Sequence, residues 1–291
     1  MNDRIGVSLT RRSWLQLAGG TCIACALPSP VALAGTPFSS NRFSVETQGT
    51  RRDGGYDVIL LPGLASGPAI WRGLTPLLTG HRVHLVHVAG FEKKPAGGNA
   101  QGKILLPIVE ELARYIESRN LRHVAIIGHS MGGTLAMMLA LRKPALINRA
   151  MVVDMLPDGS GMIGGTSAGL GYLAAQLNGY FTGTKAGRQL LADMVRKTPG
   201  GRDSDPRVIS QSLAELAQTD LTPRLASFPC PLSIVYATPA DAQMAAEQKR
   251  RYRAAYASAR SAKLTAIGPS GHMIMLDQPR QFATTVKDFL K

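Results

Sequence analysis

The chain has 291 residues and a formal net charge of +14 at pH 7. Its basic residues are scattered and are not interleaved with aromatic residues, which argues against a nucleic-acid-binding protein and indicates a solvated basic surface. The length is sufficient for one large domain with its own hydrophobic core.

The first 34 residues are predicted to be a twin-arginine signal peptide. Thr10-Arg11-Arg12-Ser13-Trp14-Leu15 carries the paired arginines, a short and weakly apolar run follows, and Ala32-Leu33-Ala34 offers small residues for cleavage before Gly35. The apolar run is too short for a stable membrane span, and a buried N-terminal helix is the alternative. The paired arginines predict a bacterial protein that the twin-arginine machinery exports in the folded state, to the periplasm or out of the cell.

Cleavage after residue 34 changes the charge and the cysteine content of the chain. Three arginines and one aspartate are removed, which leaves residues 35–291 with a net charge of +12. Cys22 and Cys25 are removed as well, so Cys230 alone remains and no intramolecular disulfide is expected. Cys230 stands between two prolines before an apolar run, and we expect it to be a small buried residue and not a nucleophile.

Beyond the signal, short apolar runs alternate with longer helical patterns. The expected strands are 42–47, 57–61, 83–88, 123–127, 150–154, 232–237 and 263–267, and the expected helices are 104–117, 134–142, 242–255 and 279–290. The inner strands are continuously apolar, as in Val58-Ile59-Leu60-Leu61, which is typical of buried parallel strands. The alternation predicts an α/β fold, a doubly wound and mostly parallel sheet with helices on both faces.

One interval breaks this alternation. Residues 155–228 contain no convincing strand; they begin with a Gly-rich stretch and continue with helical patterns near 185–196 and 206–218. An insertion at this place lies over the carboxyl ends of the strands, where ligands bind in open α/β sheets. We therefore expect one domain over 35–291 in which about 155–228 form a cap that shapes the substrate pocket, with an ordinary helical insertion as the alternative.

The most informative stretch is Gly128-His129-Ser130-Met131-Gly132, which stands between an apolar strand and a helical pattern. Strand, Gly-x-Ser-x-Gly turn and helix form the context of a nucleophile elbow. Side chains at the two glycines would collide with backbone in so tight a turn, and the serine at its apex is strained with its hydroxyl exposed. Ser130 is therefore the candidate nucleophile, and the alternative is a glycine-rich turn with an incidental serine.

A serine hydroxyl needs a base that takes its proton. Five histidines are set aside. His81 and His123 stand at strand starts, and His84 and His87 lie on opposite faces of one strand. His129 lies inside the elbow and points away from the serine oxygen. None of them forms a metal-ligand cluster. His272 follows the last strand and precedes the last helix, at the carboxyl end of the sheet, and is the candidate base; a structural loop histidine is the alternative.

Acyl transfer also needs two preorganised donors for the oxyanion. The backbone N–H of Met131 is one by its position after the serine, at the start of a helix. The other is expected in Leu61-Pro62-Gly63-Leu64, where the N–H of Leu64 follows a flexible glycine. A plain turn is the alternative for this loop.

With these motifs the chain resembles an α/β-hydrolase of the esterase/lipase type over roughly residues 58–290. The resemblance rests on Leu-Pro-Gly-Leu-Ala-Ser-Gly, Gly-His-Ser-Met-Gly-Gly and Ser-Gly-His-Met-Ile-Met-Leu-Asp-Gln-Pro. Members usually have His-Gly where this chain has Pro62-Gly63, and many have Asp-x-x-Gly-x-Gly where it has Val88-Ala89-Gly90-Phe91. The resemblance implies a serine hydrolase with a Ser-acid-His triad.

The acid of the triad departs from the family pattern as well. It usually follows the penultimate strand within Gly-x-x-Asp, where this chain has no such glycine and Asp241 comes one residue late. Some hydrolases of this fold carry the acid after the preceding strand, where this chain has Asp154. A carboxylate at a strand end is held more rigidly than one on a Pro-containing loop, so we favour Asp154 and keep Asp241 as the alternative. Asp220 and Asp277 are assigned to helix capping or the surface.

These residues predict a serine hydrolase that cleaves a carboxylic ester through an acyl-enzyme, without a metal or an organic cofactor. A lactone or thioester substrate, an amidase and a cofactor-free perhydrolase use the same triad and stay open. A non-catalytic relative that binds a small molecule is a further alternative, against which the intact Ser130 and His272 argue. The expected partners are a small acyl substrate and the export machinery; the sequence indicates no oligomeric state.

Overall fold

The computed structural model describes residues 38–159, 184, 186 and 201–291. The chain divides into two compact units, Met1–Gly35 and Thr36–Lys291, and the fold described here is that of the second. The signal peptide expected over residues 1–34 lies outside the described residues and stays a prediction. No helix in the described ranges combines the length and apolar character that crossing a membrane requires.

A seven-stranded sheet forms the centre of the described structure. The strands are β1 Phe43–Gln48, β2 Asp57–Leu61, β3 Arg82–Val88, β4 Val124–His129, β5 Arg149–Val153, β6 Leu232–Ala237 and β7 Ala262–Ile267. Their spatial order is β1-β3-β2-β4-β5-β6-β7; β1 pairs antiparallel with β3 and every other pair is parallel. The predicted doubly wound, mostly parallel sheet is confirmed, and each predicted strand is present with its bounds shifted by at most two residues.

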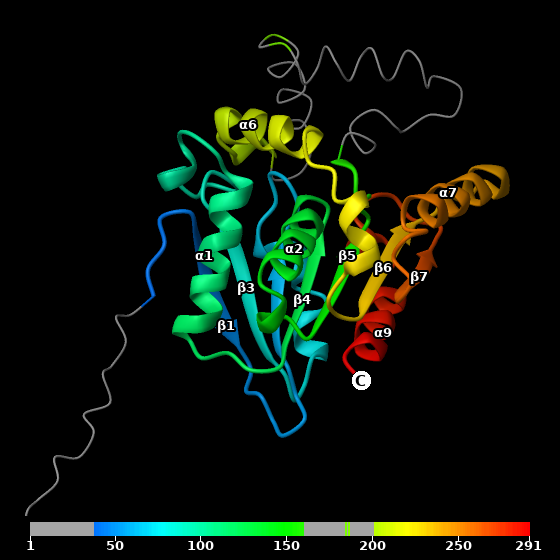
Figure 1. Ribbon diagram of the computed structural model, residues 1–291, viewed down its shortest axis with the longest axis horizontal. Helices are drawn as coiled ribbons and strands as arrows, with labels where there is room; N and C mark the ends of the chain where they lie inside the picture. The colour runs from blue at the N-terminus through cyan, green and yellow to red at the C-terminus, as the bar shows by residue number, and fades with distance from the viewer. Residues whose placement is uncertain (1–37, 160–183, 185, 187–200) are drawn as a thin grey trace, which may run out of the picture. The chain divides into compact units, whose positions relative to one another are not determined.

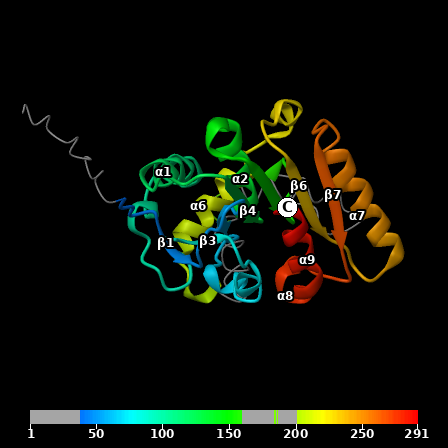
Figure 2. The ribbon, with the colours of Figure 1, turned by 90° about the horizontal axis from the view of Figure 1, so that it is seen from below.

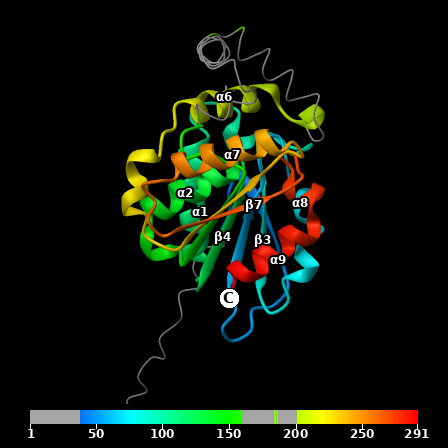
Figure 3. The same ribbon diagram turned by 90° about the vertical axis from the view of Figure 1, so that its right-hand side faces the viewer.

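Helices cover both faces of this sheet. The α-helices are α1 Leu105–Ser118, α2 Met131–Arg142, α6 Pro206–Ala217, α7 Ala242–Ala255, α8 Ile274–Asp277 and α9 Pro279–Phe289. The short 3₁₀ helices are η1 Pro68–Trp71, η2 Thr75–Leu77, η3 Gly97–Asn99, η4 Pro144–Leu146, η5 Gly201–Asp203 and η6 Thr222–Ser227. Figures 2 and 3 show α1 and α2 on one side of the strands and α8 and α9 on the other.

The continuously apolar strands bury both of their faces. Ile59 and Leu61 of β2 belong to the hydrophobic layer under α1 and α2, whereas Val58 and Leu60 belong to the layer that contains Trp71 of η1 and residues of α9. Successive side chains of a strand point to opposite faces, so a strand between two helical layers requires apolar residues at every position. The unbroken apolar runs in the sequence have this cause.

The expected cap is described only in part. Helix α6 corresponds to the helix predicted near 206–218, whereas the Gly-rich stretch and most of the helix predicted near 185–196 lie outside the described residues. Figure 1 shows α6 above α1 and α2, at the end of the sheet where the loops after β3 and β5 emerge. The N–H of Asp205 donates to the carbonyl of Gly90 at 2.7 Å, and Glu215 accepts from the N–H groups of Ile104 and Leu105 at 2.8 and 3.0 Å. These bonds attach α6 to the body of the domain.

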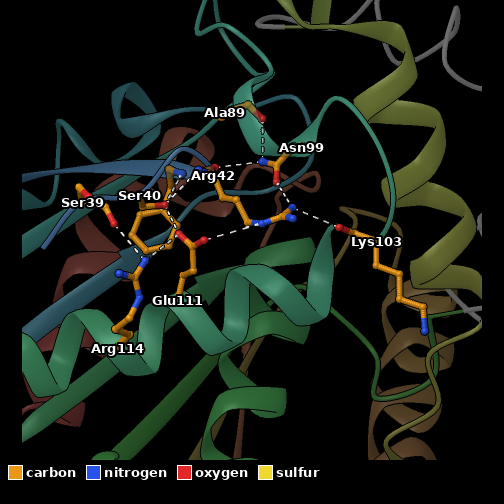
Figure 4. Close-up of polar contacts among 9 residues, drawn as sticks. Ser39, Ser40, Arg42, Ala89, Asn99, Lys103, Glu111 and Arg114 are labelled. Carbon is orange, nitrogen blue, oxygen red and sulfur yellow. Dashed lines mark hydrogen bonds and ion pairs between the residues drawn. The ribbon is translucent and has the colours of Figure 1, made fainter.

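The first described residues are attached to α1 by a polar network (Figure 4). Ser40 donates from its hydroxyl to Glu111, and the guanidinium of Arg114 donates to the carbonyl of Ser39 at 3.0 Å. The amide of Asn99 donates to the carbonyls of Arg42 and Ala89, both at 3.0 Å. The segment before β1 is thereby held against α1, and Asn99 joins this segment to the loop after β3.

Cys230 is a free, buried thiol before β6, as expected from the two flanking prolines. Burial raises the pKa of this thiol to about 11, so the group stays protonated at neutral pH. Among the described residues, no charged group lowers its pKa, and burial is the cause of the shift.

Candidate active site

Ser130 lies between β4 and α2 at the apex of a sharp turn. Its backbone has φ +52° and ψ −121°, a region that residues other than glycine rarely adopt and that costs about 1–3 kcal/mol. A Cβ at Gly128 would lie 2.0 Å from the carbonyl oxygen of Gly132, and a Cβ at Gly132 would lie 2.3 Å from the carbonyl oxygen of Leu61. The two glycines are therefore required by close backbone contacts, as the elbow motif predicts.

The strained serine is attached to the neighbouring strand. Its N–H donates to the carbonyl of Val153, the last residue of β5, at 2.9 Å. Helix α2 begins immediately after it, at Met131, three residues earlier than the sequence pattern predicts. Gly132 and Gly133 disfavour a helix on propensity alone, but α2 approaches β2 closely at Gly132 and β5 closely at Gly133, and these tertiary contacts prevail.

His272 lies on the loop between β7 and α8. Its Nδ1 is 2.7 Å from Oδ2 of Asp154, and about 45% of its side chain is exposed. The loop is held by backbone bonds: the N–H of Ser270 donates to the carbonyl of Thr238 at 3.0 Å, and the N–H of Gly271 donates to the carboxylate of Asp277 at 2.8 Å. Asp277 thus supports the loop of the candidate base.

Asp154 follows β5 directly and is 5% exposed. Besides His272 it receives two hydrogen bonds on Oδ1, from the N–H of Ala237 at 3.0 Å and from the hydroxyl of Tyr252 at 3.1 Å. Burial acts to raise the pKa of this carboxyl, but the hydrogen bond and positive charge of His272 and the N–H of Ala237 outweigh it, and the pKa is lowered. Asp154 is therefore an ionised, fully bonded carboxylate at neutral pH.

The structure places Asp154, and not Asp241, in contact with the candidate base. Asp241 is exposed and occupies the N-cap of α7, where its side chain accepts from the N–H of Met244 at 2.8 Å. This bond satisfies one of the free amides at the start of a helix. The capping geometry explains why a carboxylate stands one residue later than the family pattern requires.

The two candidate oxyanion donors lie on segments that meet at the serine. Leu64 follows β2, and its neighbour Gly63 is so close to the elbow that a Cβ there would lie 3.2 Å from Cβ of Ser130. Met131 is the buried first residue of α2. Backbone N–H groups at a helix start have no partner within the helix and lie at its positive end, which suits a developing negative charge.

Two other histidines, His84 and His129, are buried in the structure. His84 is buried at the opposite end of the sheet from His272, with Nε2 3.1 Å from Asp57 and Nδ1 2.8 Å from the hydroxyl of Tyr115. His129, which the sequence sets aside because it points away from the serine oxygen, is buried beside His272, and the two rings have centroids 4.5 Å apart.

Sequence reasoning missed Tyr252. It recurs with Tyr256 at a spacing of four residues on the buried face of α7, a pattern that reads as core packing. Burial raises the pKa of both hydroxyls, so both are protonated donors: Tyr252 donates to Asp154, and Tyr256 donates to the carbonyl of Met155 at 2.8 Å. Only the contacts of these two hydroxyls with the residues after β5 reveal the difference between them.

Tyr252→Phe is expected to lower turnover about 5- to 30-fold, because one hydrogen bond to the ionised Asp154 is worth about 1–2 kcal/mol. Tyr256→Phe is the matched control, since it removes a hydroxyl of the same helix that does not contact the carboxylate; its turnover is expected within about twofold of wild type. Steady-state hydrolysis of p-nitrophenyl acetate measures both. Equal losses in the two variants would show that only the packing of α7 matters.

Comparisons with known proteins agree on one family. A model of the alpha/beta hydrolase family matches residues 58–285. The chain is 33% identical over 105 residues to a pimeloyl-[acyl-carrier protein] methyl ester esterase of Aeromonas hydrophila, covering 35% of this chain but only 39% of that relative. A protein of the same name from Photobacterium profundum is 27% identical over 259 residues, covering 81% of this chain and 95% of that relative.

Solved structures share the fold. A structure from work on carboxylesterases of the thaumarchaeon Nitrososphaera gargenis matches with a TM-score of 0.62 and 16% identity, over 88% of this chain and 96% of that one. At so low an identity the likeness establishes the fold alone.

Proposed function

The chain belongs to the alpha/beta hydrolase family, and from this premise we propose that it is a serine hydrolase that cleaves a carboxylic ester through an acyl-enzyme intermediate. The observation that carries the proposal is the 2.7 Å contact of His272 with the buried Asp154, on a loop packed beside the elbow that carries Ser130. Relatives named as esterases support ester cleavage.

In the proposed first step the hydroxyl oxygen of Ser130 attacks the acyl carbonyl carbon, and Nε2 of His272 takes the hydroxyl proton. Nε2 is the nitrogen that acts, because Nδ1 is engaged by Asp154. The ionised Asp154 orients the ring and stabilises the imidazolium that forms. The N–H groups of Leu64 and Met131 donate to the oxyanion.

The intermediate then breaks its bond to the leaving group. The alkoxide departs with the proton that His272 carries, which leaves the acyl group on Ser130 and a neutral imidazole. A water molecule attacks the acyl-enzyme by the same route, with His272 taking its proton and returning it to the serine oxygen. The products are a carboxylic acid and an alcohol, and no redox equivalent is consumed.

The choice of ester over amide rests on chemistry and on the named relatives. Esters are easier acyl donors than amides, because the alkoxide is the better leaving group. Lactones and thioesters react by the same steps, and hydrogen peroxide in place of water would give a peracid. Each of these is a measurable outcome of one substrate screen.

The screen uses residues 35–291 with p-nitrophenyl esters of increasing acyl length, the matching p-nitroanilides, a lactone and a thioester. We expect hydrolysis of esters well above anilides, with a pre-steady-state burst of p-nitrophenol that reports the acyl-enzyme. Binding of an ester without turnover would instead identify a small-molecule-binding relative and would overturn the proposal.

The destination of the protein is part of the same proposal. We propose that the twin-arginine signal over residues 1–34 directs export to the periplasm or beyond. Arg11→Lys combined with Arg12→Lys is expected to leave the full-length precursor in the cytoplasm, whereas Arg4→Lys, outside the pair, leaves export intact. Fractionation and immunoblotting in a bacterial host measure this. Mature protein in the periplasm with both lysines present would contradict the signal assignment.

A further inference from the structure

His129 makes a contact that neither packing nor the proposed triad requires. The residue ends β4, is 2% exposed, and stands immediately before Ser130. Its Nε2 is 3.0 Å from the main-chain carbonyl oxygen of His272. A carbonyl oxygen only accepts hydrogen bonds, so Nε2 carries the hydrogen and donates it.

This bond defines which nitrogen of the His129 ring carries the hydrogen. With the hydrogen on Nε2, a neutral imidazole leaves Nδ1 as a bare acceptor, and Nδ1 has no hydrogen-bond partner in the described part of the chain. A Cβ on Gly63 would lie 2.7 Å from this nitrogen, so the loop after β2 closes the space around it. A buried acceptor without a partner costs free energy, so the bond from Nε2 to the carbonyl of His272 is the one hydrogen bond that this buried ring makes among the described residues.

The contact joins the two segments that the chemistry must bring together. Asp154 holds the side chain of His272 through Nδ1, and Asp277 holds the preceding N–H of Gly271. The carbonyl of His272 itself is held only by His129 among the bonds of the described structure. The strand that carries the nucleophile thus holds the main chain of the base.

We propose that His129 is a positioning residue, whose Nε2–H fixes the main chain of His272 so that the imidazole stays within proton-transfer reach of Ser130. The inference rests on the proposed function, since it assigns to Ser130 and His272 the roles of nucleophile and base. A misplacement of about 1 Å between reacting groups costs about a hundredfold in rate, which is the scale on which such a contact acts.

The charges around His272 are compatible with this role. Among the described residues, the groups that face it are Asp154 from the end of β5 and His129 from the end of β4, and Asp277 of α8 contacts its loop. Burial, and then the nearby charge of His272, lower the pKa of His129 to about 3. His129 therefore stays neutral when His272 receives the serine proton, and it adds no second positive charge 4.5 Å away.

Two substitutions separate donation from packing. His129→Gln places an amide N–H close to the position of Nε2 but loses the ring, whereas His129→Phe keeps a ring and loses the donor. We expect His129→Phe to lower kcat for p-nitrophenyl acetate about 10- to 100-fold with KM changed less than threefold, and His129→Gln to retain kcat within about fivefold of wild type. A residue that serves only to fill space predicts the opposite order.

A second readout needs no activity. Hydrogen exchange of peptides that cover residues 268–273 is expected to quicken at least tenfold in His129→Phe and to stay near wild type in His129→Gln. Should the Phe variant fail to fold by circular dichroism, His129→Asn takes its place, because its shorter amide does not reach the carbonyl of His272.

Failure of the positioning role and failure of the proposed function give different experimental results. Unchanged loop exchange in the Phe or Asn variant, or a Phe variant more active than the Gln variant, overturns the positioning role. If the wild-type protein neither hydrolyses esters nor reacts with a fluorophosphonate, the proposed function fails and the catalytic role of His129 with it. Loop exchange then decides only whether His129 holds the loop.

Discussion

Ser130→Ala is expected to lower ester hydrolysis by about a millionfold, because the triad acts as a unit and its nucleophile cannot be replaced by water at the same position. The variant is also expected to lose covalent labelling by a fluorophosphonate probe. The φ of +52° at this position predicts no large gain or loss of stability, since alanine inherits the same strained backbone. The thermal midpoint should therefore stay close to that of wild type.

The measurement uses residues 35–291 with p-nitrophenyl acetate and a fluorescent fluorophosphonate. Ser118→Ala is the matched control, because Ser118 lies at the end of α1 and its hydroxyl donates to the carbonyl of Tyr115 at 3.1 Å, within the same helix. It should keep full activity and full labelling. Hydrolysis or labelling by Ser130→Ala at the wild-type level would remove the basis of the proposed mechanism.

Asp154→Asn is expected to lower kcat about 10⁴-fold while leaving the fold intact. An amide in place of the carboxylate no longer stabilises the imidazolium, and it favours the wrong tautomer of His272. The effect exceeds that of Tyr252→Phe by about three orders of magnitude, because the tyrosine acts only through the carboxylate that Asp154 supplies.

Asp241→Asn provides the comparison for this variant. Asparagine is as good an N-cap as aspartate, so α7 keeps the bond to the N–H of Met244 and activity should stay within about threefold of wild type. Steady-state kinetics of the two variants side by side decide the acid. A larger loss in Asp241→Asn than in Asp154→Asn would reverse the assignment.

Local patterns in the sequence predicted most of the fold. The strands were found because a strand between two helical layers is apolar at every position, and that signal is local. Helix α8 was missed because its four residues, Ile274–Asp277, are too few to show a helical period. The early start of α2 was missed because two glycines oppose a helix until packing against β2 and β5 is considered.

Part of the candidate site could likewise be predicted from local sequence patterns, and part could not. The sequence by itself determined the elbow, because the motif formed by Gly128, Ser130 and Gly132 spans only five consecutive residues. It also singled out His272, because this residue follows the last strand. Only the tertiary structure decided that Asp154 and not Asp241 touches that histidine, and that Tyr252 and His129 support the pair. The physical reason is distance along the chain: these bonds join residues 98 to 143 positions apart, and only the packing of parallel strands and of α7 brings them within 3.1 Å.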